Sequence, residues 1–321
     1  MKLHVLSPAA DGWIDPPTDS LFRQLPNKSE LAAADAVLVP ISFKHDFKFD
    51  ERLGDKLNGK KWVLSDWSEF GWQWDQQQGF LWGRDRIEHP AFRDHAEYQK
   101  FDQFVRDNPP VLTFQRELLE KDRTDKLLPI EYLSWLPEHG NDTKDDFLKR
   151  PLEVSYYWGR SSEWRVQMQG DIFAEAAARG FDVLTQFDHV DKAIQDNANS
   201  KKWLAVFTPH YSRIRVEDIQ YIVRKSKVTI IMPGAGIKTF RHGEHCGDAI
   251  MALRNDRLAW AYPWTAVQNC LNAEFAWTIW SDLQDQDRLY DIYVAAMENA
   301  RNYRPAEYLR RWVNGNIERV L

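Results

Sequence analysis

Residues 230–248 read I-I-M-P-G-A-G-I-K-T-F-R-H-G-E-H-C-G-D, and this stretch decides how we interpret the chain. Its first residues close an apolar, largely β-branched run, which predicts a buried strand that ends at Pro233. A loop with two glycines follows, and residues 248–254 have the composition of a helix. The stretch therefore predicts a strand, a tight loop and a helix start, the unit from which parallel α/β sheets are built.

The loop of this stretch carries groups that suit an anion. Gly234 and Gly236 let the backbone approach a ligand closely, and a helix start offers free N–H groups and a positive dipole end. Lys238 and Arg241 add positive charge at an end where the dipole disfavours cations, which favours a nearby phosphate or diphosphate over two solvated side chains. Glu244 only accepts hydrogen bonds when ionised, so it suits ribose or sugar hydroxyls, or is an ordinary first-turn acid.

The same alternation of strands and helices runs through the chain in two blocks. A polar, turn-rich linker at residues 137–149 separates them. We expect an α/β protein of two Rossmann-like domains that face a cleft, at 1–150 and 151–300, with a C-terminal helix at 301–321 that packs back on the first domain. The expected strands are 3–7, 36–42, 62–65, 111–114, 152–157, 181–187, 203–208, 228–232 and 258–262, and a further helix is expected near Thr265.

Composition excludes several classes of protein. With 321 residues, 43% hydrophobic and 28% charged, the chain predicts a globular protein with a sizeable core, and no apolar run has the length of a membrane span. A net charge of −6 argues against a surface that grips nucleic acid throughout. The N-terminus lacks the apolar core of a signal peptide, and Cys246 and Cys270 match no metal spacing. A reducing cytoplasm is the simplest location.

Two further loops that follow strands resemble the first one. Arg160 stands between a predicted strand and a helix capped by Ser161 or Ser162, and Arg165 lies one turn further on. Both arginines suit an anion, or are surface residues of an ordinary capped helix. His210, in a loop after the strand at 203–208, could contact a nucleobase or be only a loop residue.

Taken together, these motifs resemble GT-B glycosyltransferases, nearest to the exostosin-like and viral sugar transferases. The resemblance rests on W-G-R-S-S-E-W-R at 158–165, on G-A-G-I-K-T-F-R-H-G-E at 234–244, and on the closing aromatic helix near Trp312. It implies a nucleotide-diphosphate sugar, such as a UDP-sugar, as donor. It implies further that the domain at 151–300 binds this nucleotide sugar and that the domain at 1–150 lies on the acceptor side. It also implies that Arg160, Arg165, Lys238 and Arg241 neutralise the diphosphate and that Glu244 holds ribose or the donor sugar.

The chain departs from this pattern in two places. Its first strand is followed by P-A-A-D-G and not by a glycine-rich finger, and its late motif by R-N-D-R-L-A-W-A-Y-P-W. There is no clear D-x-D motif, which fits a metal-independent transferase that needs no cofactor, with cations and a helix dipole stabilising the departing diphosphate. The group of His242, Glu244, His245, Cys246 and Asp248 lacks zinc-site spacing, so we expect no metal there.

Inverting transfer requires a general base for the acceptor hydroxyl. Asp66 is the first candidate because it stands at a strand end in the first domain, with Asp11 and Glu69 as alternatives. Asp66 is equally suited to cap the segment that follows it. A retaining mechanism would need no base at this place.

The acceptor remains open between two hydroxyl compounds. A glycan or glycoside would stack on Trp72, Trp74 or Trp82, whereas a hydroxymethylated pyrimidine in viral DNA would use the arginines of 84–123 on phosphates. Two other functions suit the same architecture: a non-catalytic sugar-nucleotide-binding protein, and a nucleotide-sugar epimerase.

Overall fold

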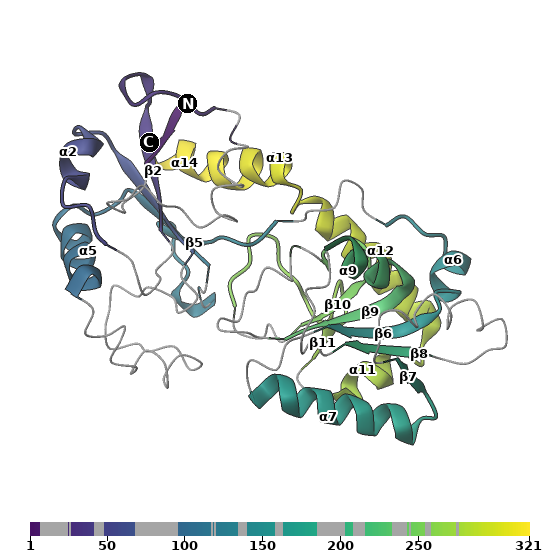
Figure 1. Cartoon of the computed structure of the whole chain (residues 1–321). Coiled ribbons are helices and arrows are strands. Elements are labelled where there is room, and N and C mark those ends of the chain that lie inside the picture. Colours follow the sequence, from purple (N-terminus) through teal and green to yellow (C-terminus); the bar gives the residue numbers. More distant parts are fainter. Residues whose placement is uncertain are drawn as a thin grey trace. The chain divides into compact units, whose positions relative to one another are not determined.

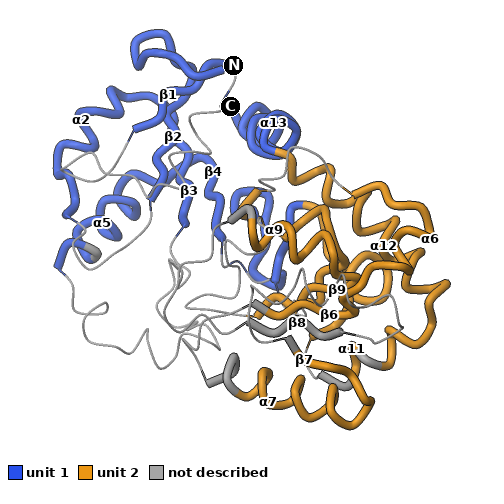
Figure 2. Tube along the Cα trace, turned by 45° about the vertical axis from the view of Figure 1, so that its right-hand side comes forward, with its two compact units in different colours: residues 1–131, 257–261, 305–321 blue, residues 132–256, 262–304 orange. Residues whose placement is uncertain are grey.

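Eight of the nine apolar runs predicted as strands belong to two parallel sheets in the computed structural model (Figure 1). The structure describes residues 1–6, 25, 27–41, 48–67, 96–116, 118, 120–133, 140–157, 163–184, 203–207, 216–232, 243, 245–253, 258–273 and 276–321. Figure 2 shows that the chain divides into two compact units. The first unit comprises residues 1–131, 257–261 and 305–321, and the second comprises residues 132–256 and 262–304.

Five strands form the sheet of the first unit in their order along the chain, β1-β2-β3-β4-β5, and every pair is parallel. The three interior strands β2, β3 and β4 are buried along their whole length, as expected for strands covered on both faces. The strands are β1 (Leu3–Val5), β2 (Ala36–Ile41), β3 (Trp62–Asp66), β4 (Leu112–Gln115) and β5 (Leu127–Pro129).

Two helices, α2 (Leu53–Leu57) and α5 (Ala96–Asp107), pack on one face of this sheet through a shared apolar cluster. From α5, Phe101 and Val105 enter the cluster, with Phe104 packed against it. This spacing of three and four residues is the apolar stripe of a surface helix. The short 3-10 helices η1 (Leu31–Ala33) and η2 (Glu120–Asp122) belong to the same unit.

The C-terminal helices also belong to the first unit, so the chain returns to it after completing the second. They are α13 (Pro305–Tyr308), the π-helix η5 (Leu309–Asn314) and α14 (Gly315–Val320). The side chains of Leu309, Val313 and Ile317 are fully buried. Trp312 Nε1 donates a hydrogen bond to the Pro129 carbonyl over 2.8 Å, which ties η5 to the end of β5.

The second unit contains a six-stranded parallel sheet in the order β11-β10-β9-β6-β8-β7. Its strands are β6 (Leu152–Tyr157), β7 (Asp182–Leu184), β8 (Trp203–Phe207), β9 (Ser226–Ile231), β10 (Ile250–Leu253) and β11 (Leu271–Asn272). Its helices are α6 (Lys144–Leu148), α7 (Glu163–Ala178), α9 (Val216–Lys225), α11 (Ala276–Asp282) and α12 (Gln286–Arg301). Figure 1 shows α7 and α11 on one face of this sheet and α9 and α12 on the other. The prediction of two Rossmann-like α/β units is therefore confirmed.

Three predicted elements near the late motif are wrong. The helix predicted at 248–254 is strand β10, which pairs with β9 and is completely buried. A short apolar run such as I-M-A-L is compatible with either a helix or a buried strand, and pairing with β9 decides between them. Residues 258–261 form no named strand and belong to the first unit, and a turn at 267–269 followed by β11 replaces the helix predicted near Thr265.

Candidate functional site

The segments predicted to bind the donor begin after three neighbouring strands of the second sheet. Residues 158–165 follow β6, residues 208–212 follow β8, and residues 233–244 follow β9. The sheet order places β9, β6 and β8 side by side, and all three strands are parallel. The three segments therefore leave the sheet at the same edge, where α/β proteins bind ligands.

The chain changes direction across the sheet at the centre of this group. From β6 the chain passes through α7 to β7, on the side of β8. From β9 it passes to β10, on the opposite side of β6. The connections that leave β6 and β9 thus diverge, and this divergence is the topological switch point at which open α/β sheets bind their ligands.

The predicted donor-binding side chains themselves lie outside the described residues. These are Arg160, His210, Gly234, Gly236, Lys238, Arg241 and Glu244. Arg165 lies in α7, whose backbone is described, but its side chain is outside the described part. The sheet topology therefore establishes only the strands after which these segments begin. The roles of the side chains in donor binding stay predictions.

The end of the late motif is held by close backbone packing. Gly243 is buried, and a Cβ atom at this position would collide with the backbone carbonyl of Leu133. Gly247 has a φ of 102°, a left-handed value that favours glycine, and its carbonyl accepts a hydrogen bond from Gly140 N over 2.7 Å. His245 is completely buried, with Nδ1 2.9 Å from Thr229 Oγ1 on β9. The motif thus ends at a fixed point in the core of the second unit.

Asp248 has a structural environment and does not start a helix, which removes the predicted dipole at this position. Its carboxylate accepts a hydrogen bond from Arg224 Nε over 3.1 Å. Burial raises the pKa of Asp248, while the Arg224 charge and hydrogen bond act in the opposite direction. Asp248 therefore forms an ion pair at the amino edge of the sheet. A phosphate-binding site after β9 would then depend on Lys238, Arg241 and the backbone of the loop, without a helix dipole at Asp248.

Arg150 hydrogen-bonds to backbone carbonyls at the amino edge of the second sheet. Its NH1 group donates hydrogen bonds to the carbonyls of Ser226 over 2.6 Å and Asp248 over 2.7 Å, and its Nε donates to Asp142 Oδ2 over 2.9 Å. Its guanidinium also lies 5.1 Å from the centre of the Tyr293 ring. Every strong contact of this buried arginine is internal, so Arg150 is a structural residue and not a ligand-binding one.

The carboxyl edge of the first sheet ends in a row of aligned residues: Ile41, Asp66, Gln115 and Pro129. Residues directly opposite one another in a sheet project from the same face, so Asp66 and Gln115 are neighbours on that face. Asp66 is the last residue of β3 and is 1% exposed. Arg116, also buried, donates its backbone N–H to the Asp66 carbonyl over 3.0 Å.

Sequence reasoning missed Gln115. Within the described chain its buried Nε2 has no hydrogen-bond partner. The available signal was its position as the polar residue that ends the apolar run of β4. The other candidate bases, Asp11 and Glu69, and the predicted stacking residues Trp72, Trp74 and Trp82 lie outside the described residues.

Three further features concern metals, thiols and membranes. In the described ranges, no three His, Cys, Asp or Glu side chains are grouped so that they could hold a metal ion. Cys246 and Cys270 are buried and form no disulfide bond, and burial raises the pKa of Cys246. None of the helices that the structure describes combines the length and apolar character needed to cross a bilayer.

Comparison with known proteins gives similarity in structure only. No protein-family model matches the chain, and no curated protein matches it in sequence. Three solved structures that it resembles are OtsA in the apo form, the pneumococcal O-GlcNAc transferase GtfA in complex with UDP and GlcNAc, and the glycosyltransferase SnogD from Streptomyces nogalater. Their identities are 9%, 11% and 11%, with TM-scores of 0.47, 0.46 and 0.43.

The matches cover most of this chain but not always most of the other protein. They extend over 95%, 89% and 98% of this chain and over 77% of OtsA, 56% of GtfA and 98% of SnogD. GtfA is named as an O-GlcNAc transferase and SnogD as a glycosyltransferase, in agreement with the resemblance predicted from the sequence. A specific likeness to exostosin-like transferases stays a prediction. Because every TM-score is below 0.5, we base the functional proposal on the residues and topology of this chain.

Proposed function

We propose that this protein is a glycosyltransferase that moves a sugar from a nucleotide-diphosphate sugar to the hydroxyl group of a glycan or glycoside. One observation carries the proposal: the segments after β6, β8 and β9 leave neighbouring parallel strands at one edge, beside the topological switch point. These three segments are rich in groups that suit a sugar nucleotide, namely Arg160, His210, Lys238, Arg241 and Glu244.

In the proposed reaction the second unit binds the donor. Arg160, Lys238 and Arg241 would neutralise the diphosphate, and charge-assisted hydrogen bonds from arginine suit its oxygens. As the bond between the anomeric carbon and the diphosphate oxygen breaks, these cations would stabilise the negative charge that develops on the leaving group. The proposed mechanism needs no metal ion, since side-chain cations take this role.

The first unit would supply the base. Asp66 would remove the proton of the acceptor hydroxyl while that oxygen attacks the anomeric carbon, so that the sugar is transferred with inversion. Its position at the carboxyl end of β3 supports this role, because ligands of parallel sheets lie beyond these strand ends. Asp11, Glu69 and the stacking residues Trp72, Trp74 and Trp82 are further candidates for the acceptor side of the reaction.

Donor binding is tested by thermal unfolding with UDP, GDP, ADP and dTDP, each alone and as its glucose and N-acetylglucosamine conjugate. A ligand that binds only the folded state at 100 times its Kd stabilises the protein by about 2.7 kcal/mol. We expect at least one diphosphate to raise Tm by several degrees, and Arg241→Ala to remove most of the shift. Arg179→Ala is the control, since Arg179 directly follows α7 and pairs with Glu175 of that helix over 3.1 Å.

Two results would contradict the donor site: no shift with any of these compounds, or an equal shift in wild type and Arg241→Ala. Product analysis then separates the possible functions. A transferase releases some free sugar by transfer to water and more product when an acceptor is added, a pure binding protein releases none, and an epimerase changes the donor sugar without any acceptor. Comparing glycosides with duplex DNA that contains hydroxymethylcytosine identifies the class of acceptor.

A further inference from the structure

A pocket of about 610 Å³ lies in the first unit, beside the edge strand β5. All its lining residues belong to this unit, whereas the segments assigned to the donor follow strands of the second unit. The volume falls within the range of roughly 300–1,000 Å³ that is usual for small-molecule sites. The pocket is therefore a candidate for a second binding site, apart from the one assigned to the donor.

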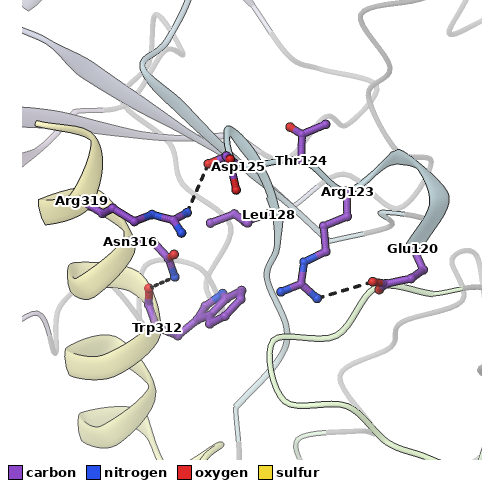
Figure 3. A pocket seen from close by; sticks show the side chains of 8 residues that line it. All are labelled: Glu120, Arg123, Thr124, Asp125, Leu128, Trp312, Asn316 and Arg319. Carbon is purple, nitrogen blue, oxygen red and sulfur yellow. Dashed lines mark hydrogen bonds and ion pairs between the residues drawn. The ribbon is translucent and has the colours of Figure 1, made fainter.

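One wall of the pocket is the C-terminal helix. Figure 3 shows Trp312, Asn316 and Arg319 reaching from this helix, with Arg123 and Glu120 on the opposite side. Trp312 stands in the π-helix η5, and π-helical turns are rare and occur frequently at functional sites. This rare type of turn therefore carries Trp312, which is the only aromatic residue among the described residues that line the pocket.

The Trp312 ring is held in one orientation by two contacts. Its Nε1 donates a hydrogen bond to the Pro129 carbonyl over 2.8 Å, and the Arg123 guanidinium lies 5.7 Å from the ring centre. Arg123 is in turn fixed by hydrogen bonding from NH1 to the Trp260 carbonyl over 3.4 Å. A fixed indole offers a flat apolar surface with little entropy left to lose when a ligand covers it.

The charged residues that line the pocket around the Trp312 ring have no net charge in sum. Arg123 and Arg319 supply two positive charges, and Glu120 and Asp125 supply two negative ones. Arg123 NH1 lies 3.7 Å from Glu120 Oε1, and Arg319 NH2 donates to the Asp125 carbonyl over 3.4 Å. Two carboxylates in the lining oppose a phosphate. A neutral ligand with both donor and acceptor groups suits this lining better.

We propose that this pocket binds a neutral saccharide. The C–H face of a pyranose ring would stack on Trp312, and its hydroxyl groups would bond with the guanidinium of Arg319, the amide of Asn316 and the carboxylates of Glu120 and Asp125. Polar side chains with fixed planes around an aromatic face can satisfy several hydroxyl groups at once. Binding here needs no donor nucleotide.

The test is saturation-transfer NMR on the protein with free saccharides. The probes are the methyl glycosides of glucose, galactose, mannose and N-acetylglucosamine, together with cellotriose and chitotriose. We expect at least one probe to receive magnetisation from the protein, with little change when NaCl is raised to 0.5 M because the ligand is uncharged. UDP and inorganic phosphate should not displace the bound saccharide.

Variants locate the site. Arg319→Ala should weaken binding about tenfold, since a hydrogen bond to a charged group is lost. Trp312→Leu should abolish binding. Arg310→Ala is the matched control, because Arg310 stands on the same helix, pairs with Glu307 over 2.9 Å and does not line the pocket. Melting curves establish that each variant is folded, and Arg319→Ala carries the test if Trp312→Leu is not.

Three results would overturn the inference: no probe binds, a probe binds equally to wild type and Arg319→Ala, or UDP competes for the pocket. The saccharide inference and the proposed transfer reaction can fail separately. Donor binding by the second unit is measured with Arg241→Ala, and saccharide binding by the first unit with Arg319→Ala.

Discussion

The two sheets of this protein are both parallel, but they differ in how the chain crosses them. In the first sheet the strand order follows the sequence from β1 to β5, so every connection advances in the same direction. In the second sheet the chain starts at β6, passes to the edge strand β7 and back to β8 on one side, and then continues to β9, β10 and β11 on the other. Only the second sheet therefore has a reversal point within the strands that the structure describes.

Because the connections of the two sheets differ in this way, we expect the two sheets to have different roles. Where the strand order reverses, the connections that leave two neighbouring strands diverge at the carboxyl edge of the sheet. Ligands of α/β sheets bind at such a point, so we expect the donor to bind to the second sheet. The first sheet has no such divergence among its described strands. At its carboxyl edge the last residues of neighbouring strands are aligned, and Asp66 and Gln115 are two of them. We therefore expect changes in the first sheet to affect the chemical step and changes in the second to affect donor binding or stability.

The largest expected effect is that of Asp66→Asn on the chemical step. If Asp66 is the general base, the substitution lowers kcat for transfer by about 10²- to 10⁴-fold, which is the usual contribution of such a base. The Kd of the donor should change little, because the donor-binding segments follow strands of the second sheet. Steady-state transfer assays and donor titrations on the same preparation measure the two quantities.

Asp107→Asn is the control for this variant, since Asp107 is exposed at the end of α5. If Asp66→Asn transfers sugar at the wild-type rate, Asp66 is a structural end to β3 and the base is another group, such as Asp11 or Glu69. If it weakens donor binding as strongly as transfer, the expected division of work between the sheets is wrong.

The next effect concerns stability at the amino edge of the second sheet. Arg150→Met removes the donor that serves the carbonyls of Ser226 and Asp248. Buried carbonyls left without partners should lower the free energy of unfolding by about 3 kcal/mol. Urea unfolding at pH 7 measures the loss, and Arg179→Met, an exposed change within the same unit, should cost much less. A loss for Arg150→Met no greater than the loss for the control would show that this network does not close the sheet edge.

A smaller effect is expected where the late motif meets the core. In Gly243→Ala the new methyl group collides with the Leu133 carbonyl, so the backbone of the motif must shift. We expect donor affinity to fall about tenfold, equivalent to about 1.4 kcal/mol, while the protein stays folded. Isothermal titration with the nucleotide that gives the largest thermal shift measures this change.

Gly170→Ala is the matched change for this experiment. Gly170 lies inside α7 and a Cβ atom there meets no other group within 4 Å. Alanine should stabilise this helix by roughly 0.5–1 kcal/mol without changing donor affinity. Equal donor affinity in Gly243→Ala and wild type would mean that the motif does not position the ligand.

The fold was largely predictable because each strand is a short apolar run between turn residues. The runs at β6 and β9 were recognisable as strands from composition alone. Helix α5 was not predicted, although Phe101 and Val105 form its apolar stripe, because the aromatic and charged residues before it obscure the period. Strand β10 was mistaken for a helix, since only its pairing with β9 distinguishes the two.

The candidate site was predictable to a lesser degree. Sequence order was sufficient to identify Asp66 as a residue at a strand end, and the sheet order then adds that Gln115 stands beside it. Nothing in the sequence indicates that β9, β6 and β8 are neighbours, because this depends on pairing between distant strands. The pocket at Trp312 was missed for the same reason, since residues 120–125 and 312–319 meet only in the folded first unit.

The smallest effect is a pH dependence at Asp248. Burial raises the pKa of its carboxyl group above the ordinary value of 3.8, and Arg224 only partly offsets this. A raised pKa means that the folded protein holds the proton more tightly than the unfolded chain does, so the contribution of Asp248 to stability falls as the pH rises through its folded pKa. An asparagine side chain at this position does not titrate. We therefore expect Asp248→Asn to gain stability relative to wild type between pH 4 and pH 7, as measured by urea unfolding at both values. A relative loss over this interval would mean that the ion pair with Arg224 outweighs burial, and that the amino edge of the second sheet is stabilised by charge as well as by the hydrogen bonds of Arg150.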